Sequence, residues 1–242
     1  MDTIKLQNNK IKMIAHRGLS GILQENTIPA FELAASKSYL GIETDVHVTK
    51  DKRYIICHDD NIKRVTGVDK VIEESLYDEL SRIPVFNKDG SLNENMHLPS
   101  LEEYLDICHK NNKISVLELK NDMEENEIVE IVEVVKKFNH YESTIFISFS
   151  SKNIINFRKN FKDGNCQFLS DLATIEKIDE AFNIAINYNV DLDVYYVNLT
   201  QEFVDKCKAN NILINVWTVD DKEKALELIK MGVDYITSNI LE

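Results

Sequence analysis

The stretch LEEYLDICHKNNKISVLEL, residues 101–119, decides the class of fold. Its first half is apolar at an i, i+3, i+4, i+7 spacing, which is typical of a helix that buries one face. Ser100 and Glu103 form the capping-box pattern with which such a helix begins. The run at 114–119 is then largely apolar, as in a parallel strand that is buried on both faces. A helix followed by such a strand is the repeating unit of an α/β protein.

The same alternation of helix-like and strand-like segments runs along most of the chain. We expect strands at Lys12–Ala15, Ile42–Val48, Ile114–Leu119, Thr144–Phe149, Cys166–Leu169, Val194–Asn198, Ile212–Trp217 and Tyr235–Thr237. Residues 128–135 and 178–185 have helical apolar spacing, and Thr27 and Gly232 suit the start of the first helix and the end of the last. Eight strands that alternate with helices favour a (β/α)₈ TIM barrel over a doubly wound sheet.

Residues 61–98 interrupt this alternation. They are charged and poor in strand signals, with a helix-like stretch EESLYDELSR at 73–82 and the turn signal NKDGS at 87–91. The segment is too long for an ordinary connection, and the extended run Tyr54–His58 leads into it. We therefore expect one domain over residues 1–242, with a small inserted subdomain or lid at about 61–98 after the second strand.

The composition limits the classes of partner. Of 242 residues, 43% are apolar, which is enough to bury a sizeable core. Lys and Arg number 28 against 41 Asp and Glu, a net charge of −13. This balance argues against nucleic acid or an anionic membrane as a partner, because affinity for phosphate backbones comes mainly from Lys and Arg. An anionic substrate needs a local positive charge that overturns the overall sign.

The sequence also bears on location. It has no window close to 18 apolar residues, so we expect no stable membrane insertion. The amino-terminal residues lack the apolar core and cleavage site of a secretory signal. Four cysteines lie far apart in apolar stretches, at Cys57, Cys108, Cys166 and Cys207. We therefore expect reduced, buried cysteines in a cytoplasmic protein.

Carboxylates gather where two of the expected strands end. Glu43 and Asp45 lie on one face of the second strand, and Glu118 takes the matching position on the third. Such carboxylates in one barrel mouth repel one another unless a cation lies between them. An all-oxygen site of this kind suits Ca²⁺ or Mg²⁺. His47 continues the same face, and we expect it to line the barrel without binding the metal.

Two histidines and two cationic residues lie near the same strand ends. His16 and His58 can divide proton removal and proton donation between them. Arg17 can form paired hydrogen bonds to a phosphate, with Lys120 as a second positive charge. The alternative for both cations is a salt bridge to Glu43 or Glu118. We assign no role to the histidines expected in loops or on helix surfaces: His97, His109 and His140.

Six short motifs occur in a fixed order: HRG at 16–18, ENT at 25–27, ETD at 43–45, HD at 58–59, LELK at 117–120 and WTV at 217–219. Together they resemble the glycerophosphodiester phosphodiesterase family over about Met13 to Thr237, a family that also inserts a small subdomain after the second strand. The resemblance implies a (β/α)₈ barrel that uses a divalent metal to hydrolyse glycerophosphodiesters to sn-glycerol 3-phosphate and an alcohol.

The resemblance also assigns roles to residues. It places metal ligands at Glu43, Asp45 and Glu118, acid–base groups at His16 and His58, phosphate contacts at Arg17 and Lys120, and pocket walls at Trp217 and Phe149. Glu25 of the ENT motif is expected to orient the loop around His16. The residues leave open the physiological metal, the preferred alcohol group, the oligomeric state, which histidine is the base, and whether water or the substrate's own hydroxyl attacks.

Some positions depart from the family pattern. Gln24 replaces a usual Pro, His47 a common Gln, and Ser238-Asn239 a usual Asp and aromatic residue, while the chain ends at Glu242 without room for a full eighth helix. These departures bear on substrate preference and on closure of the barrel. Two other functions stay open. A phospholipase D-like barrel for lysophospholipids or sphingomyelin needs an apolar rim at its mouth. A silent binding protein does not need the intact histidines and carboxylates.

Overall fold

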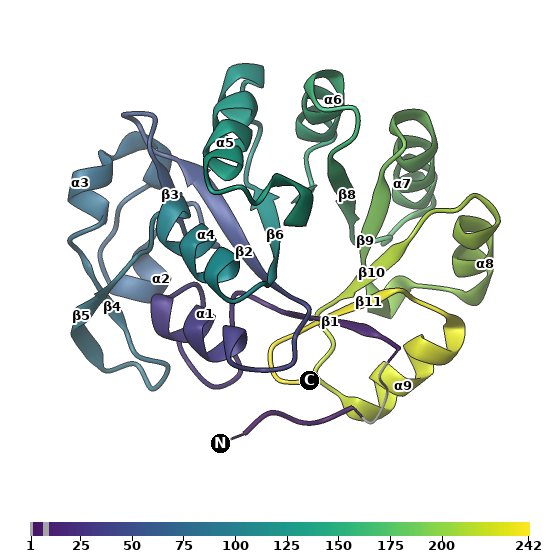
Figure 1. Cartoon of the computed structure of the whole chain (residues 1–242), viewed down its shortest axis with the longest axis horizontal. Helices are drawn as coiled ribbons and strands as arrows, with labels where there is room; N and C mark the ends of the chain where they lie inside the picture. The colour runs from purple at the N-terminus through teal and green to yellow at the C-terminus, as the bar shows by residue number, and fades with distance from the viewer. Residues whose placement is uncertain (1, 7–9) are drawn as a thin grey trace.

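The structure, a computed structural model, describes residues 2–6 and 10–242. Within this part of the chain, eight parallel strands close into a barrel, which confirms the predicted TIM barrel (Figure 1). In spatial order the strands are β1 (Lys12–Ala15), β2 (Gly41–Val48), β6 (Ile114–Leu119), β7 (Thr144–Ser148), β8 (Asn165–Ser170), β9 (Asp191–Tyr195), β10 (Ile214–Trp217) and β11 (Tyr235–Ser238). Pairing of β1 with both β2 and β11 closes the ring.

Helices surround the barrel. They are α1 (Ile28–Ala35), α4 (Leu101–Lys110), α5 (Glu125–Lys137), α6 (Ser151–Asn160), α7 (Ile175–Tyr188), α8 (Gln201–Ala209) and α9 (Lys222–Met231). The Thr27 side chain caps α1, and Ser100 with Glu103 forms the predicted capping box of α4. Gly232 ends α9 with a φ of 100°, a backbone conformation that glycine adopts without a Cβ clash. None of the described helices combines the length and the apolar character needed to cross a membrane.

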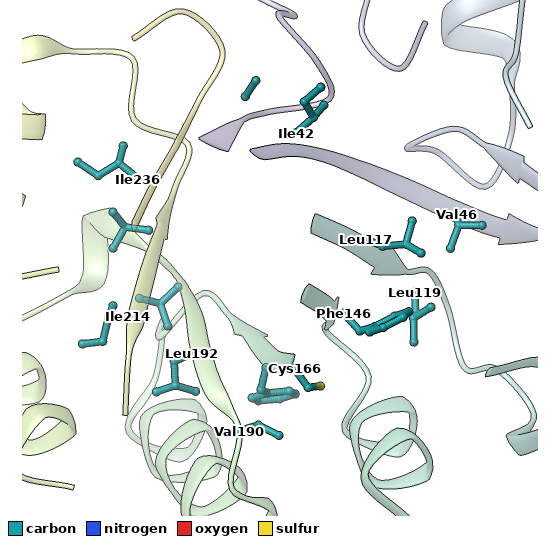
Figure 2. Packing of buried hydrophobic residues seen from close by; sticks show 14 of the residues in the cluster. Ile42, Val46, Leu117, Leu119, Phe146, Cys166, Val190, Leu192, Ile214 and Ile236 are labelled. Carbon is teal, nitrogen blue, oxygen red and sulfur yellow. The ribbon is translucent and has the colours of Figure 1, made fainter. Parts of the chain in front are cut away.

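Alternation along the strands divides the core into an outer and an inner part. Side chains that point outward pack against the helices, and Figure 2 shows several of them, among them Ile42, Leu117 and Phe146. On β6, Val116 points the other way, into the barrel, where it packs with Ile14. Because side chains alternate, the carboxylate of Glu118 also points inward. The four cysteines are buried and free, as predicted.

Two predicted strands have bounds that differ by more than one residue from those of the structure. The strand expected at Val194–Asn198 is instead β9 at Asp191–Tyr195, and a 3₁₀ turn, η3 (Tyr196–Asn198), follows it. The polar residues Asp191 and Asp193 interrupt the apolar run that predicts a buried strand, so the first part of β9 was not predicted. β10 begins at Ile214, two residues later than expected, because the Leu213 N–H is already bonded to the Asp191 side chain.

The segment between β2 and α4 forms a small unit beside the barrel, at the left of Figure 1. It contains β3 (Tyr54–Ile56), antiparallel to β2, then α2 (Lys63–Thr66), η1 (Ile72–Glu74), α3 (Tyr77–Leu80), β4 (Pro84–Phe86) and β5 (Leu92–His97). Ile55, Ile62, Leu80 and Met96 belong to its own apolar cluster.

Three local expectations for this unit and for the histidines are wrong. The helix expected at 73–82 is split into η1 and α3, because Ser75 and Leu76 are extended between them. The strand-poor region contains the antiparallel β4–β5 hairpin. His97 lies on β5, not in a loop or on a helix, whereas His109 on α4 and His140 in the connection after α5 lie where they were expected.

The described residues after β11 form no helix. The Ile4 N–H donates to the Ile240 carbonyl at 3.0 Å, and Leu6 and Leu241 are buried side chains. The Glu242 carboxylate accepts hydrogen bonds from the Ser38 backbone and hydroxyl, each at 2.6 Å. The segments around Ile4 and around Leu241 therefore pack side by side.

Candidate active site

Three buried carboxylates lie together at the carboxyl ends of β2 and β6. Asp45 and Glu118 are register partners on these neighbouring strands, and Glu43 is two residues before Asp45 on the same face. One oxygen from each of the three lies within 4.8 Å of the others. The structure thus brings the three predicted metal ligands to one point.

The electrostatics of this cluster favour a cation. Burial and the charge of Asp45 raise the pKa of Glu43 well above its usual value, and they raise the pKa of Glu118 to about 7. Burial also opposes ionisation of Asp45, but the charges of Arg17 and Lys120 outweigh it and lower its pKa. Asp45 Oδ1 is buried without a hydrogen-bond partner among the described residues. Its nearest cation is Lys120 Nζ at 3.6 Å. A site made of carboxylate oxygens, one of them without a hydrogen bond, is compatible with a divalent metal ion.

The two predicted cations flank the carboxylates. Arg17 has a φ of 52°, which turns its backbone N–H toward Glu43 Oε2 at 2.8 Å. Its guanidinium donates to Glu25 Oε1 at 2.9 Å and lies 3.6 Å from Asp45 Oδ2. Lys120 Nζ lies 2.8 Å from Glu118 Oε1. The salt bridge of Lys120 to Glu118 was expected as its alternative role, whereas Arg17 pairs with Glu25 and Asp45 and not with Glu43 or Glu118. Both cations still lie next to the carboxylate cluster.

His16 is hydrogen-bonded to Asn239, which directly follows the neighbouring strand β11. Its Nδ1 lies 2.8 Å from Asn239 Oδ1, and its Nε2 lies 3.9 Å from Glu43 Oε2. Because an amide oxygen only accepts, Nδ1 carries the proton and Nε2 has a free lone pair in the neutral ring. Burial and the charge of Arg17 lower the pKa of His16 to about 4. Asn239 is itself fixed, because it donates to Asp220 Oδ2 at 2.6 Å.

His58 is held by an ion-pair cluster that begins in the insertion. Its Nδ1 lies 2.7 Å from Asp59 Oδ1. Arg64 on α2 donates to Asp59 Oδ2 at 2.6 Å and to both oxygens of Glu25 at 2.9 and 2.8 Å. The hydrogen bond from Arg64 is the main cause that lowers the pKa of Asp59 to about 2. Glu25 also accepts a hydrogen bond from Arg17. The ion pairs of Arg64 with Asp59 and Glu25 therefore link the surroundings of His58 to those of Arg17.

A cavity of about 260 Å³ opens at this end of the barrel. One wall carries His16, Arg17, Glu43, His58 and Glu118, and the remaining lining residues are Ile147, Phe149, Leu169, Asp193, Trp217 and Thr237. The rings of Phe149 and Trp217 meet edge to face at 5.6 Å. Lys120 lines a second, adjoining cavity of about 590 Å³, which shares His58, Glu118 and Phe149 with the first. All predicted site residues except the deeply buried Asp45 therefore line one of two adjoining cavities.

With this geometry in place, the comparison with known proteins is direct. The profile of the glycerophosphoryl diester phosphodiesterase family matches residues 16–241. The chain belongs to this family. The predicted family and enzyme class are confirmed.

Two proteins similar to this phosphodiesterase cover nearly the whole chain, and a third covers part of it. A glycerophosphodiester phosphodiesterase from Caldanaerobacter subterraneus subsp. tengcongensis is 28% identical over 232 residues, covering 95% of this chain and 94% of the relative. A phosphodiesterase from Oleispira antarctica, solved in complex with the product sn-glycerol-3-phosphate, has a TM-score of 0.84 at 24% identity, covering 95% of this chain and 93% of the other. Human lysophospholipase D is 32% identical over 151 residues, which are 59% of this chain and 46% of the relative.

Sequence reasoning missed several residues of this phosphodiesterase site. Asn26 donates to Asp45 Oδ2 at 2.8 Å, although its place in the ENT motif was a signal. Arg64 lies six residues after His58, and no pattern in the sequence joined it to Glu25. Asn239 and Asp193 reach the site only through strand pairing across the barrel, which a linear sequence does not display.

Proposed function

We propose that this protein hydrolyses glycerophosphodiesters to sn-glycerol 3-phosphate and an alcohol, using a divalent metal and two histidines. The observation that carries the proposal is the meeting of three buried carboxylates, two cations and two histidines around two adjoining cavities. The product bound in the Oleispira structure is the one that this reaction releases.

Glu43, Asp45 and Glu118 would hold the metal, because oxygen-only ligands suit Ca²⁺ or Mg²⁺. When bound there, a divalent ion supplies a Lewis acid that neutralises charge on phosphoryl oxygens. Asn26 orients one ligand oxygen of Asp45 with its hydrogen bond, and the Arg17 backbone orients one oxygen of Glu43. Such partners outside the ligand set fix the direction of the ligands.

Arg17 and Lys120 would bind the phosphate. The Arg17 guanidinium lines the 260 Å³ cavity, and its fork of N–H donors matches the oxygens of a phosphate group. Lys120 Nζ contributes a second positive charge from β6. Donors fixed in place before the reaction stabilise the charge that grows on the phosphoryl group in the transition state.

The hydrogen bonds of the histidines suggest a division of roles. His16 holds its proton on Nδ1 toward Asn239, so Nε2 is available to take a proton from the attacking hydroxyl or water. His58 Nδ1 lies against the Asp59 carboxylate, which fixes the orientation of the ring. His58 would then give its proton to the departing alcohol. Both attack routes, by water and by the substrate's own hydroxyl, use the same two groups.

A second function, hydrolysis of lysophospholipids, is favoured by an apolar rim at the mouth. Phe149, Ile175 and Val197 are 49%, 74% and 57% exposed, and each follows the carboxyl end of a barrel strand. Tyr195 and Trp217 extend this apolar surface, with ring centroids 5.2 Å apart. An acyl chain can pack on such a rim, and a lysophospholipase D is among the relatives.

One assay separates these functions. Glycerophosphocholine and lysophosphatidylcholine are each incubated with the protein, with chelator and then with added Mg²⁺ or Ca²⁺. Release of sn-glycerol 3-phosphate that requires the metal supports the proposal. A higher kcat/KM for the lysophospholipid favours the second function. Binding of glycerophosphocholine without any hydrolysis would indicate a silent binding protein.

A further inference from the structure

Asp193 is a buried acid that the roles above leave unused. It lies on β9, is 2% exposed, and lines the 260 Å³ cavity together with Glu43 and Glu118. It is not part of the carboxylate group that can hold a metal. Most other residues that line the cavity outside the charged wall are apolar, including Ile147 and Leu169. A carboxyl group in these surroundings needs a reason to be there, because burying a polar group is costly.

The hydrogen bonds around Asp193 leave one of its oxygens without a partner. Asn215, its register partner on β10, donates a hydrogen bond to the Asp193 carboxyl. The other side of the Asn215 amide is occupied, because its Oδ1 accepts from the Thr237 hydroxyl at 3.2 Å. Asp193 Oδ1 has no hydrogen-bond partner in residues 2–6 and 10–242. The strands thus hold the carboxyl group in place and keep one oxygen free.

We propose that the free oxygen of Asp193 binds the terminal hydroxyl of the glycerol group and so selects glycerol-containing diesters. This inference rests on the proposed function. The metal ligands lie at one wall of the cavity and Asp193 lines the same space, so a glycerol phosphate between them can meet both. A buried polar group left unpaired by the wrong ligand gives strong discrimination against a substrate that lacks the matching hydroxyl.

The state of the Asp193 carboxyl suits this role. Burial and the nearby charge of Glu118 raise its pKa, which favours the protonated form. A protonated carboxyl both donates and accepts a hydrogen bond, as a hydroxyl does. An asparagine in the same place keeps a donor and an acceptor, whereas a leucine of similar size has neither.

The test compares glycerophosphocholine with 2-hydroxypropyl phosphocholine, which lacks only the terminal hydroxyl. We expect wild-type kcat/KM to favour glycerophosphocholine by about 10²-fold or more. Asp193→Leu should remove most of this preference by lowering kcat/KM for glycerophosphocholine alone. Asp193→Asn should keep the preference within about tenfold of wild type.

Gln167→Leu is the matched control. Gln167 lies inside the barrel on β8, is 2% exposed and has an unpaired Oε1, but it is not among the residues that line the cavity. It should change the melting temperature without changing the substrate ratio. Equal loss on both substrates in Asp193→Leu, or a wild-type ratio near one, would overturn the proposal even if the variant folds poorly. Failure of the wild type on both substrates would refute the proposed function itself.

Discussion

Arg64→Gln tests whether the insertion organises the catalytic groups. The change removes the guanidinium that joins Asp59, the partner of His58, to Glu25, the partner of Arg17. Glutamine keeps a polar side chain but cannot reach two carboxylates with several donors at once. Without the guanidinium, Asp59 and Glu25 are no longer joined, so the residues that orient His58 and Arg17 lose a common ion-pair partner.

The structure sets the scale of each effect. The Arg64 side chain is 47% exposed and its partners Glu25 and Asp59 are 20% and 30% exposed, so water screens both ion pairs. Partly exposed pairs contribute about 0.2–1 kcal/mol each, and we expect a loss of about 1 kcal/mol in the free energy of unfolding. For a chain of this size that lowers the melting temperature by about 2–4 °C. Misplaced catalytic groups are more costly, and we expect kcat/KM to fall by about 10- to 100-fold.

Lys63→Gln provides the matched control. It removes the same charge from the neighbouring residue, whose ion pair with Asp69 at 2.8 Å is exposed on both sides. The assay measures kcat and KM for glycerophosphocholine, the melting temperature, and the Mg²⁺ or Ca²⁺ affinity of each variant. Metal affinity should stay unchanged in Arg64→Gln, because Arg64 has no contact with the metal ligands among the described ion pairs. Equal activity in the two variants would refute the positioning role.

The other predictions concern the metal, the histidines and the insertion. Glu118→Gln should abolish both metal-dependent activity and stabilisation by metal, and a full metal response in this variant would contradict the ligand assignment. In the wild-type protein the pKa of Glu118 is raised from 4.5 to about 7. Without metal, the stabilising effect of this carboxyl is therefore present below pH 4.5 and lost as the pH rises through 7. Between pH 5 and 8 the melting temperature of chelated wild type should therefore fall more than that of the variant. His16→Ala and His58→Ala should each lower kcat by about 10²-fold or more, with partial rescue of the acid variant by a substrate with a better leaving group. Replacing residues 61–98 by a short Gly/Ser connection should change the kcat/KM ratio among glycerophosphocholine, glycerophosphoethanolamine and glycerophosphoglycerol more than metal affinity, and an unchanged ratio would reject a lid role.

The barrel could be predicted from sequence where side chains are buried on both faces of a strand. β6 is such a strand, and its apolar residues fill both the outer and the inner core. β9 carries Asp191 and Asp193 inside the barrel, where a pattern search expects apolar residues. β5 is mostly exposed and was missed for the opposite reason, because no buried face marks it. Hydrophobic periodicity therefore fails to predict strands that bury polar side chains and strands that contribute little to the core.

The helix expected at 73–82 shows how local propensity is overridden. Its sequence favours a helix throughout, but Ile72 and Leu80 both enter the small cluster of the insertion. A continuous helix places residues eight apart on one face, more than two turns from each other. The extended residues between η1 and α3 instead fold the chain so that both side chains enter the same cluster. Tertiary packing decides such short elements.

Some residues of the candidate site could be predicted from the sequence and others could not. Glu43, Asp45 and Glu118 could be predicted because strand alternation alone aims them at one point. Arg64 could not, since its function depends on Glu25, which is 39 residues away. Asn239 meets His16 only because β1 pairs with β11. Residues that react can be recognised in a sequence by their chemical type and by their place at strand ends. Residues that position them can be recognised only from their contacts in the structure.

Charge links the fold to the reaction. The chain carries a net charge of −13 and would act on an anion, so the sign must be reversed locally. Arg17 and Lys120 do not achieve this by themselves, because three ionised carboxylates against two cations leave one negative charge. The raised pKa of Glu43 and of Glu118 shows that protons otherwise take up part of this excess. A divalent cation in their place would leave the cluster with one net positive charge, which attracts a phosphodiester. The carboxylates that repel an anion when they are ionised are thus the same groups that would attract one by holding a divalent cation.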